Sequence, residues 1–519
     1  MSLDPVLFIT KFDVTKGYSS VYQSSSSIHD NLEYKSLPSG LHQSRFDIIR
    51  FLHSGYNGIA IFRQNGMNKD IDSNDRQTIK MYSLGLLYKD DEPKYLKRAL
   101  EQFDAILSKF IDDETINENV FIEESKEMFQ RYLKDSKSVS NGAPINHDIS
   151  DDSFATTFNH AGPFVYDLWR YMLNNKRILI KNHFDRAGVL SNDNIINLNT
   201  ALIRNLGQVI HHSSETFKSK EQIQTSEILY NISLQDIDTL EELSKSKSGY
   251  LACTSDDVIF TRMNLFDYMV EFDHLTKKPI LKKNIYDRNS KTHSFKEIKF
   301  SNVDLNSFIK LQTGMDFELF RSMFDEWKLS ADNSWASLLN SWIYGVPKSL
   351  SNVNNYGIID ENKSFEDIKK NVGSAASNAT SESTTASSAS KKGKLLNKEL
   401  VLAHFDVILS HYCDTINDII KNDDQDYESQ RHGGEGSYDS EVDEFFGNDE
   451  NDGLVSTKLD DNGLPIIELT LSDIHQLYLN PFAADDKQFV CEFVKNNFKR
   501  TVSITSFAGL SWQIFSCCG

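Results

Sequence analysis

The chain has 519 residues, and its 55 Lys and Arg against 75 Asp and Glu give a formal net charge of −20. That length predicts about three domains, while the negative balance argues against a nucleic-acid-binding protein and disfavours broad adhesion to anionic membranes. Five cysteines cannot build a disulfide framework, so we expect a cytoplasmic protein.

Residues 1–92 are predicted to be rich in β-structure. Short apolar runs at 6–9, 47–52, 58–62 and 79–88 predict strands, and the middle two flank a Gly/Asn-containing loop at 53–57, which is a hairpin signal. The serine-rich stretch from Ser19 to Ile28 is read as a loop or a ragged strand. Apolar residues at helical spacing then predict a helix over 95–111.

The middle of the chain alternates helices with buried strands. A polar stretch at 136–153 predicts a domain boundary. Gly162-Pro163 opens a predicted helix that runs to Leu173, and the apolar run 178–180 follows it as a strand. Asp257 to Phe260 is a further strand candidate. This alternation, which continues to about residue 300, indicates an α/β module.

The remainder of the chain is predicted to be mainly helical. The helices are expected at 305–328, 334–343, 397–421, 470–479 and 486–498. A Ser/Ala/Thr-rich segment, Gly373 to Ser390, predicts a flexible linker. Asn422 to Asp461 holds 14 acidic residues against Arg431 and Lys458, a net charge of −12, and predicts a disordered loop.

The sequence contains no motif of a self-contained catalytic centre. It has no GxxxxGK phosphate loop, HExxH, GxSxG or CxxC. His211 and His212 are adjacent and point in different directions, so they do not indicate a metal site. The first ten residues do not resemble a secretory signal, and no run of about 18 apolar residues predicts a membrane span. We therefore expect no catalytic residue, cofactor or metal.

A family resemblance runs along nearly the whole chain. Glu33 to His42, which ends in Leu-Pro-Ser-Gly-Leu-His, resembles a patterned stretch of DENN-domain proteins of the LCHN-like branch. The segments that resemble other parts of that group, in the same order, are 47–63, 81–87, 168–180, 251–267 and 480–489.

The resemblance implies a tripartite α/β plus α fold. Its parts would be an upstream longin-like module (1–135), a linker (136–160), a core α/β DENN module (161–300) and a downstream helical module (301–519). We expect loops 368–396 and 422–462 to be disordered within the last part.

The resemblance also implies a candidate activity, guanine nucleotide exchange on a Rab-type small GTPase. Such a protein works by stabilising the opened, nucleotide-free GTPase and needs no chemical site of its own. The alternatives are a non-catalytic Rab-binding scaffold or tether at an organelle or lipid-droplet surface, and a small-molecule enzyme with an unrecognised site.

The GTPase-binding candidates are assigned from this resemblance, and each also has a structural reading. The structural alternative for Pro38 and Gly40 is that they build a turn. For Trp169 and Arg170 it is helix packing together with a surface pair. Cys253 is expected to be buried, and Asp256 to cap a helix or shape a turn. The candidates are Leu37, Pro38, Ser39, Gly40, Leu41, His42, Arg45, Trp169 and Arg170.

The stretch 501–519 is a candidate membrane anchor. It is apolar and uncharged, follows Lys499 and Arg500, and contains Cys517 and Cys518. Adjacent cysteines in such a setting predict S-palmitoylation and a peripheral membrane protein, with prenylation or a terminal strand or helix with free thiols as alternatives. Ser440, which precedes Glu441, Asp443 and Glu444, is a phosphorylation candidate.

Overall fold

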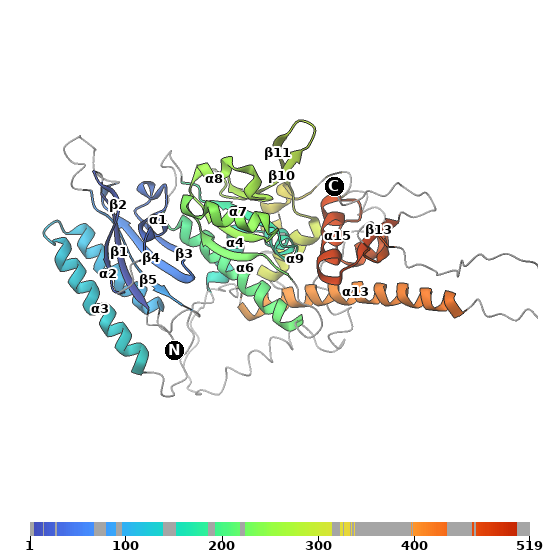
Figure 1. Ribbon diagram of the computed structural model, residues 1–519, viewed down its shortest axis with the longest axis horizontal. Helices are drawn as coiled ribbons and strands as arrows, with labels where there is room; N and C mark the ends of the chain where they lie inside the picture. Colours follow the sequence, from blue (N-terminus) through green and yellow to red (C-terminus); the bar gives the residue numbers. More distant parts are fainter. Residues whose placement is uncertain are drawn as a thin grey trace, which may run out of the picture. The chain divides into compact units, whose positions relative to one another are not determined.

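The computed structural model places most of the chain in regular elements (Figure 1). The residues that it describes are 5–13, 15–25, 29–66, 79–89, 96–138, 152–184, 193–217, 224–273, 275–313, 322–324, 326–332, 334, 337, 396, 398–432, 459–460 and 463–505. They divide into two compact units. The first consists of Met1–His211, Thr225–Ile298 and Leu396–Lys398, and the second of His212–Gln224, Lys299–Leu395 and Glu399–Gly519.

The first unit is built on a mixed sheet. In the described part of the chain this sheet has 11 strands in the order β11-β10-β9-β6-β8-β7-β3-β4-β5-β1-β2. The strands are β1 (Val6–Asp13), β2 (Gly17–Gln23), β3 (Phe46–His53), β4 (Tyr56–Gln64), β5 (Met81–Tyr88), β6 (Arg177–Lys181), β7 (Glu227–Asn231), β8 (Tyr250–Thr254), β9 (Tyr268–Phe272), β10 (Pro279–Asp287) and β11 (Thr292–Ile298).

The sheet has two halves that meet at a narrow seam. Strands β1 to β5, the first half, are antiparallel throughout. In the second half β7, β8, β6 and β9 run parallel, and β10 and β11 extend the sheet as an antiparallel hairpin. Strands β3 and β7 join the halves through the backbone pair of Phe51 with Tyr230, which we call the seam.

Helices α2 (Leu96–Asp112) and α3 (Glu118–Ser138) cover one face of the first half (Figure 1). The apolar residues of α2 recur every three or four positions, so one side of the helix faces the strands. Phe110 stacks on Phe121 with ring centroids 4.3 Å apart, and both side chains are buried. On the other face, the core includes Phe184 and Ile196 from beyond the seam.

Strands alternate with helices in the second half, because neighbouring parallel strands need a long crossover connection. The helices are α4 (Asp152–Ala161), α5 (Phe164–Leu173), α6 (Ile195–Phe217), α7 (Ile237–Lys245) and α8 (Asp257–Thr261). Every residue of α5 is buried, and Pro163 precedes it in the position where its missing N–H costs nothing.

The second unit is mainly helical. Its elements include α9 (Asn302–Thr313), α13 (Lys398–His432), α14 (Leu471–Gln476) and α15 (Ala484–Phe498), with a parallel strand pair β12 (Ile466–Thr470) and β13 (Thr501–Thr505). Tyr412 of α13 packs against Phe489 and Phe493 of α15, with centroid distances of 5.8 and 6.3 Å. In the described ranges no helix is long and apolar enough to span a bilayer.

The predicted fold class, α/β plus α, is confirmed by this architecture. The predicted hairpin is β3–β4, although its turn is only Ser54 and Gly55, both at positive φ, instead of five residues. Strand β2 (Gly17–Gln23) includes the first part of the serine-rich stretch, residues 19–23.

Two predictions of local structure were wrong. Residues 257–260, expected as a strand, lie in helix α8, and the strand there is β8. Helix α13 continues to His432, past the predicted end at residue 421 and into the segment expected to be disordered. Aspartate and glutamine are compatible with a helix that already has its first turns formed, because propagation costs less than nucleation.

Several expectations fall outside the described residues. These are Cys517, Cys518, Ser440, the linker 373–390 and most of the predicted helix 334–343. The first five residues of the candidate anchor, Thr501–Thr505, form β13 and pair with β12, so they are part of the folded second unit.

Candidate functional site at the seam

The Leu-Pro-Ser-Gly-Leu-His loop connects α1 (Leu32–Ser36) to the short helix η1 (Leu41–Gln43), which leads into β3. Leu37, Pro38 and Leu41 are buried, Gly40 is half-buried, and Ser39, His42 and Arg45 are exposed. The loop therefore has an apolar underside and a polar outer surface.

The loop is held from both sides of the seam. Gly40 has φ +86°, and a β-carbon there would stand 2.6 Å from the ring of Phe184, which belongs to the second half. From the first half, the buried Gln64 side chain donates hydrogen bonds to the carbonyls of Leu41 and Ser44, at 3.0 and 2.6 Å. The loop is therefore rigidly placed, because its backbone is fixed by two separate elements.

The carboxylate of Asp193, just before α6, binds the end of the loop. It accepts the backbone N–H groups of Arg45 and Phe46 at 2.8 and 3.3 Å and the Ser44 hydroxyl at 3.2 Å. In return, the N–H of Asn194 donates to the Phe46 carbonyl at 3.2 Å. This exchange aligns the start of β3 with the first turn of α6.

Asp47, one residue further along β3, reaches into the same helix N-terminus. Its fully buried carboxylate accepts the backbone N–H groups of Ile196 and Asn197 at 3.0 and 2.9 Å. The helix dipole favours a negative charge at this position. Burial nevertheless dominates and raises the pKa of Asp47 to about 7. The pKa of Asp47 is therefore near neutral pH, and its carboxyl group lies where the two halves meet.

A buried ion pair completes the connection. Lys35 of α1 binds Asp236 of the short helix η5 (Leu234–Asp236), with side-chain exposures of 8% and 17%. Asp236 also closes a capping box with Ser233. Burial, with the nearby His29 and Lys35, lowers the pKa of His53 to about 4, so this histidine stays neutral near the pair.

The exposed residues Ser39, Leu234 and Val258 surround the buried Asp256, and we call these four residues the junction face. The Asp256 carboxylate accepts from the Ser39 side chain and from the Leu234 backbone, and burial raises its pKa. Leu234 is 44% exposed and Val258 53% exposed. Protein interfaces commonly have apolar side chains at the centre and polar contacts at the rim. The junction face contains both kinds of group.

The other predicted residues lie inside the protein. Trp169 is fully buried and Arg170 is 5% exposed, with Arg170 bonded to Asp167 at 2.8 Å. In this structure the pair has the burial of a packing element, so neither side chain offers surface to a partner. Cys253 is fully buried and Asp256 is the N-cap of α8, as their structural readings predicted. The Asp406 carboxylate lies 3.0 Å from His212.

Sequence reasoning missed the residues from the second half: Asp193, Leu234, Asp236 and Val258. A weak signal existed, because Ser233 and Asp236 have the spacing of a capping box. In the described part of the chain, no group of three His, Cys, Asp or Glu side chains is placed to hold a metal ion.

The two-half sheet with its interlocked loop defines a two-lobed α/β domain. The comparisons agree: residues 7–279 match the family profile described as DENN domain-containing protein 11, and residues 336–519 match a domain of unknown function. The chain belongs to the DENN domain family. The match to the DENN profile covers both halves and stops at the first residue of β10.

A relative is the uncharacterized protein ANR2 of Saccharomyces cerevisiae. It is 25% identical over 319 residues, which are 51% of this chain and 57% of the relative. The match thus spans little more than half the length of that relative.

Proposed function

We propose that this protein is a guanine nucleotide exchange factor for a Rab-type small GTPase in membrane traffic. Membership of the DENN family supports this, because DENN proteins generally bind Rab GTPases. The supporting structural observation is the junction face, where exposed apolar residues of the second half flank the loop that we predicted as a GTPase contact.

An exchange factor accelerates nucleotide release by differential affinity. It must bind the nucleotide-free GTPase more tightly than the nucleotide-bound form, and it can shift the equilibrium toward the nucleotide-free state only by that difference. A rigid surface serves this purpose best, because a partner that orders on binding would lose part of the difference as entropy. The bonds of Gly40, Asp193 and Asp47 across the seam supply such rigidity. Ser39, His42, Arg45, Leu234 and Val258 would make the contact.

GDP release from a panel of purified Rab proteins tests the proposal. The full chain should accelerate release from one or two of them. Binding without acceleration would support the scaffold alternative. Neither binding nor acceleration across a complete panel, with the protein shown to be folded, would contradict both.

We further propose that Cys517 and Cys518 carry acyl groups and hold the protein at a membrane. Two acyl chains are enough for stable anchoring, whereas one is marginal. The supporting observation is the composition of the sequence around them.

Phosphorylation at Ser440 would add negative charge to a segment that is already acidic.

A further inference from the structure

Strands β10 and β11 form a hairpin at the end of the large sheet. Figure 1 shows it extending away from the helices of its own unit. Residues 292–297 of β11 are all exposed, so both faces of this strand are open to solvent. The DENN family match ends where the hairpin begins, at residue 279. Residues 275–299, which include the hairpin and its approach, are called the basic hairpin below.

The charge of the basic hairpin is opposite to that of the chain. It contains eight basic residues and two acidic ones, a net charge of +6 in a chain of net charge −20, and one of the eight, Lys282, is paired with Glu271 of β9. One of the two acids, Asp287, is engaged in the turn, where it accepts from the Asn289 N–H at 2.9 Å and the Ser290 hydroxyl at 2.8 Å. An anionic surface repels the acidic remainder of the chain and attracts the hairpin, so the protein would approach such a surface with the hairpin first.

The strand register places like charges opposite each other. Lys283 faces Lys296 across the ladder, so positive charge is concentrated at this position of the ribbon. Three large side chains on the same ribbon are also exposed: Ile285 (38%), Tyr286 (52%) and Phe295 (39%). Basic and aromatic side chains together favour the boundary between water and lipid. Their apolar parts contact the acyl chains, and the charged or polar ends of Lys, Arg and Tyr contact the headgroups.

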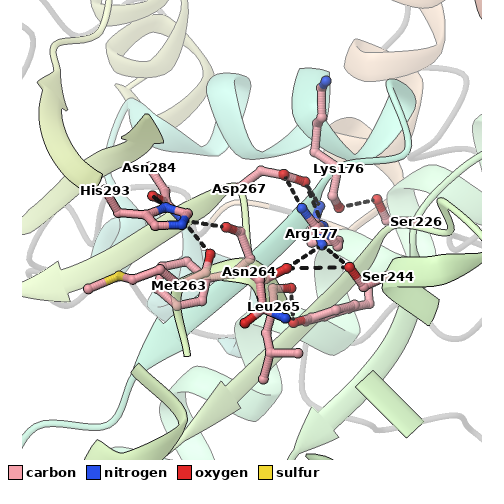
Figure 2. Close-up of polar contacts among 12 residues, drawn as sticks. Lys176, Arg177, Ser226, Ser244, Met263, Asn264, Leu265, Asp267, Asn284 and His293 are labelled. Carbon is pink, nitrogen blue, oxygen red and sulfur yellow. Dashed lines mark hydrogen bonds and ion pairs between the residues drawn. The ribbon is translucent and has the colours of Figure 1, made fainter. Parts of the chain in front are cut away.

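The hairpin is bonded to the domain at Asn284 of β10, whose backbone N–H donates to the carbonyl of Asp267 at 2.8 Å. Figure 2 shows Arg177 of β6 between Asp267, Ser244 and the carbonyl of Asn264, with its Nη2 2.6 Å from the Asp267 carboxylate. The Asn284 amide donates to the Met263 and Phe266 carbonyls at 2.6 and 2.9 Å. His293 of β11 bonds the same Asn284 side chain at 2.8 Å. The ribbon is therefore preorganised, and docking would cost little conformational entropy.

We propose that the basic hairpin docks on an anionic lipid surface. Its charges extend along the whole ribbon, from Lys277 through Arg288 at the tip to Lys299, which matches a distributed layer of headgroups better than one acidic side chain or peptide. Each Lys or Arg near such a surface adds to the attraction. The site is separate from the junction face and does not depend on exchange activity.

The test is sedimentation of the full chain with phosphatidylcholine vesicles, with and without phosphatidylserine. Both terminal cysteines are replaced by Ser, so that no acyl chain contributes. The hairpin variant carries Lys283→Glu, Arg288→Glu, Lys291→Glu and Lys296→Glu. A matched control has the same charge change at exposed helical positions: Lys97→Glu, Arg98→Glu, Lys134→Glu and Lys245→Glu. Circular dichroism and thermal unfolding establish that each variant is folded.

We expect the parent protein and the control to bind only vesicles that contain phosphatidylserine, with affinity falling as salt rises. The hairpin variant should lose about two orders of magnitude or more in affinity. Tyr286→Ser alone should weaken binding less. Equal binding by the hairpin variant and the control, or no binding of the folded parent, overturns the proposal. In the second case an acidic polypeptide becomes the better partner. GDP release in solution should be unaffected by the hairpin changes, so failure here is distinct from failure of the exchange proposal.

Discussion

The ring of Phe184 occupies the space that a β-carbon on residue 40 would need, with the nearest ring atom 2.6 Å from that position. Gly40 stands in the first half of the domain and Phe184 in the second. The glycine is thus required twice, once for its φ of +86° and once for the close approach of the ring.

Gly40→Ala should therefore destabilise the protein by about 2–4 kcal/mol, from backbone strain plus overpacking. Gly17→Ala is the matched control, since Gly17 has φ +81° but nothing within 4 Å of the added carbon, and should cost only about 1 kcal/mol. Urea unfolding of both variants measures the difference. Equal losses would show that Phe184 moves away freely and that the contact does not hold the loop.

Lys35→Met should leave Asp236 with a buried, unpaired charge and cost about 3 kcal/mol. Lys109→Met is the control, because the Lys109–Glu124 pair is 57% and 37% exposed and contributes little. Urea unfolding again gives the free energies. If the two variants lost similar stability, the ion pair across the seam would be no more important than a surface pair.

The stability of the protein should depend on Asp47 between about pH 4 and pH 7. Burial raises the folded-state pKa from 3.8 to about 7, so folding favours the protonated acid. Its contribution is complete below the unfolded pKa and is lost as pH rises through 7, by up to about 4 kcal/mol. The unfolding free energy of the parent relative to Asp47→Asn should decline across this range. A difference that stayed constant or grew with pH would contradict a raised pKa.

Leu234→Asp together with Val258→Asp should reduce Rab-stimulated GDP release at least about tenfold, because charges would replace apolar contact area at the junction face. Val120→Asp, at a residue that is 45% exposed on α3, is the control and should leave the rate unchanged. Stopped-flow release of a fluorescent GDP analogue measures the rates. Loss in the control as well, or in neither variant, would remove the junction face from the proposed site.

Replacing Cys517 and Cys518 with Ser should move the protein from the membrane fraction to the soluble fraction of cells if both are acylated. Metabolic labelling with an alkyne-tagged palmitate, followed by fractionation, tests the modification and its effect together. Replacing the buried Cys413 and Cys491 instead should not remove the label. Unchanged fractionation would show that the two cysteines are not needed for membrane association.

The sequence predicted the order of modules well and their joining poorly. Alternating apolar runs around Gly55 predicted β3–β4, and Pro163 marked the start of α5. Residues 257–260 were misread because a short apolar run fits a strand or a helix equally. Ser255-Asp256 before this run is a helix-start signal that favours the observed α8.

The contacts of the candidate site could not be predicted in the same way. Lys35 and Asp236 are 201 positions apart, and Ser39 meets Asp256 only because β7 is placed beside β3. No local propensity or spacing encodes such a pairing. It follows from the registry of whole elements, which a single sequence does not display.

The single backbone pair between Phe51 and Tyr230 has a consequence for synthesis on the ribosome. Residues 7–132 contribute an entire apolar core of their own, packed under α2 and α3, and they emerge about a hundred residues before β7. The first half can thus fold while the remainder is still being made, since domains generally fold as they appear. During that interval β3 is an open edge able to pair with another nascent chain. The arrival of β7 closes it, so delays in translation between the halves should favour aggregation at β3.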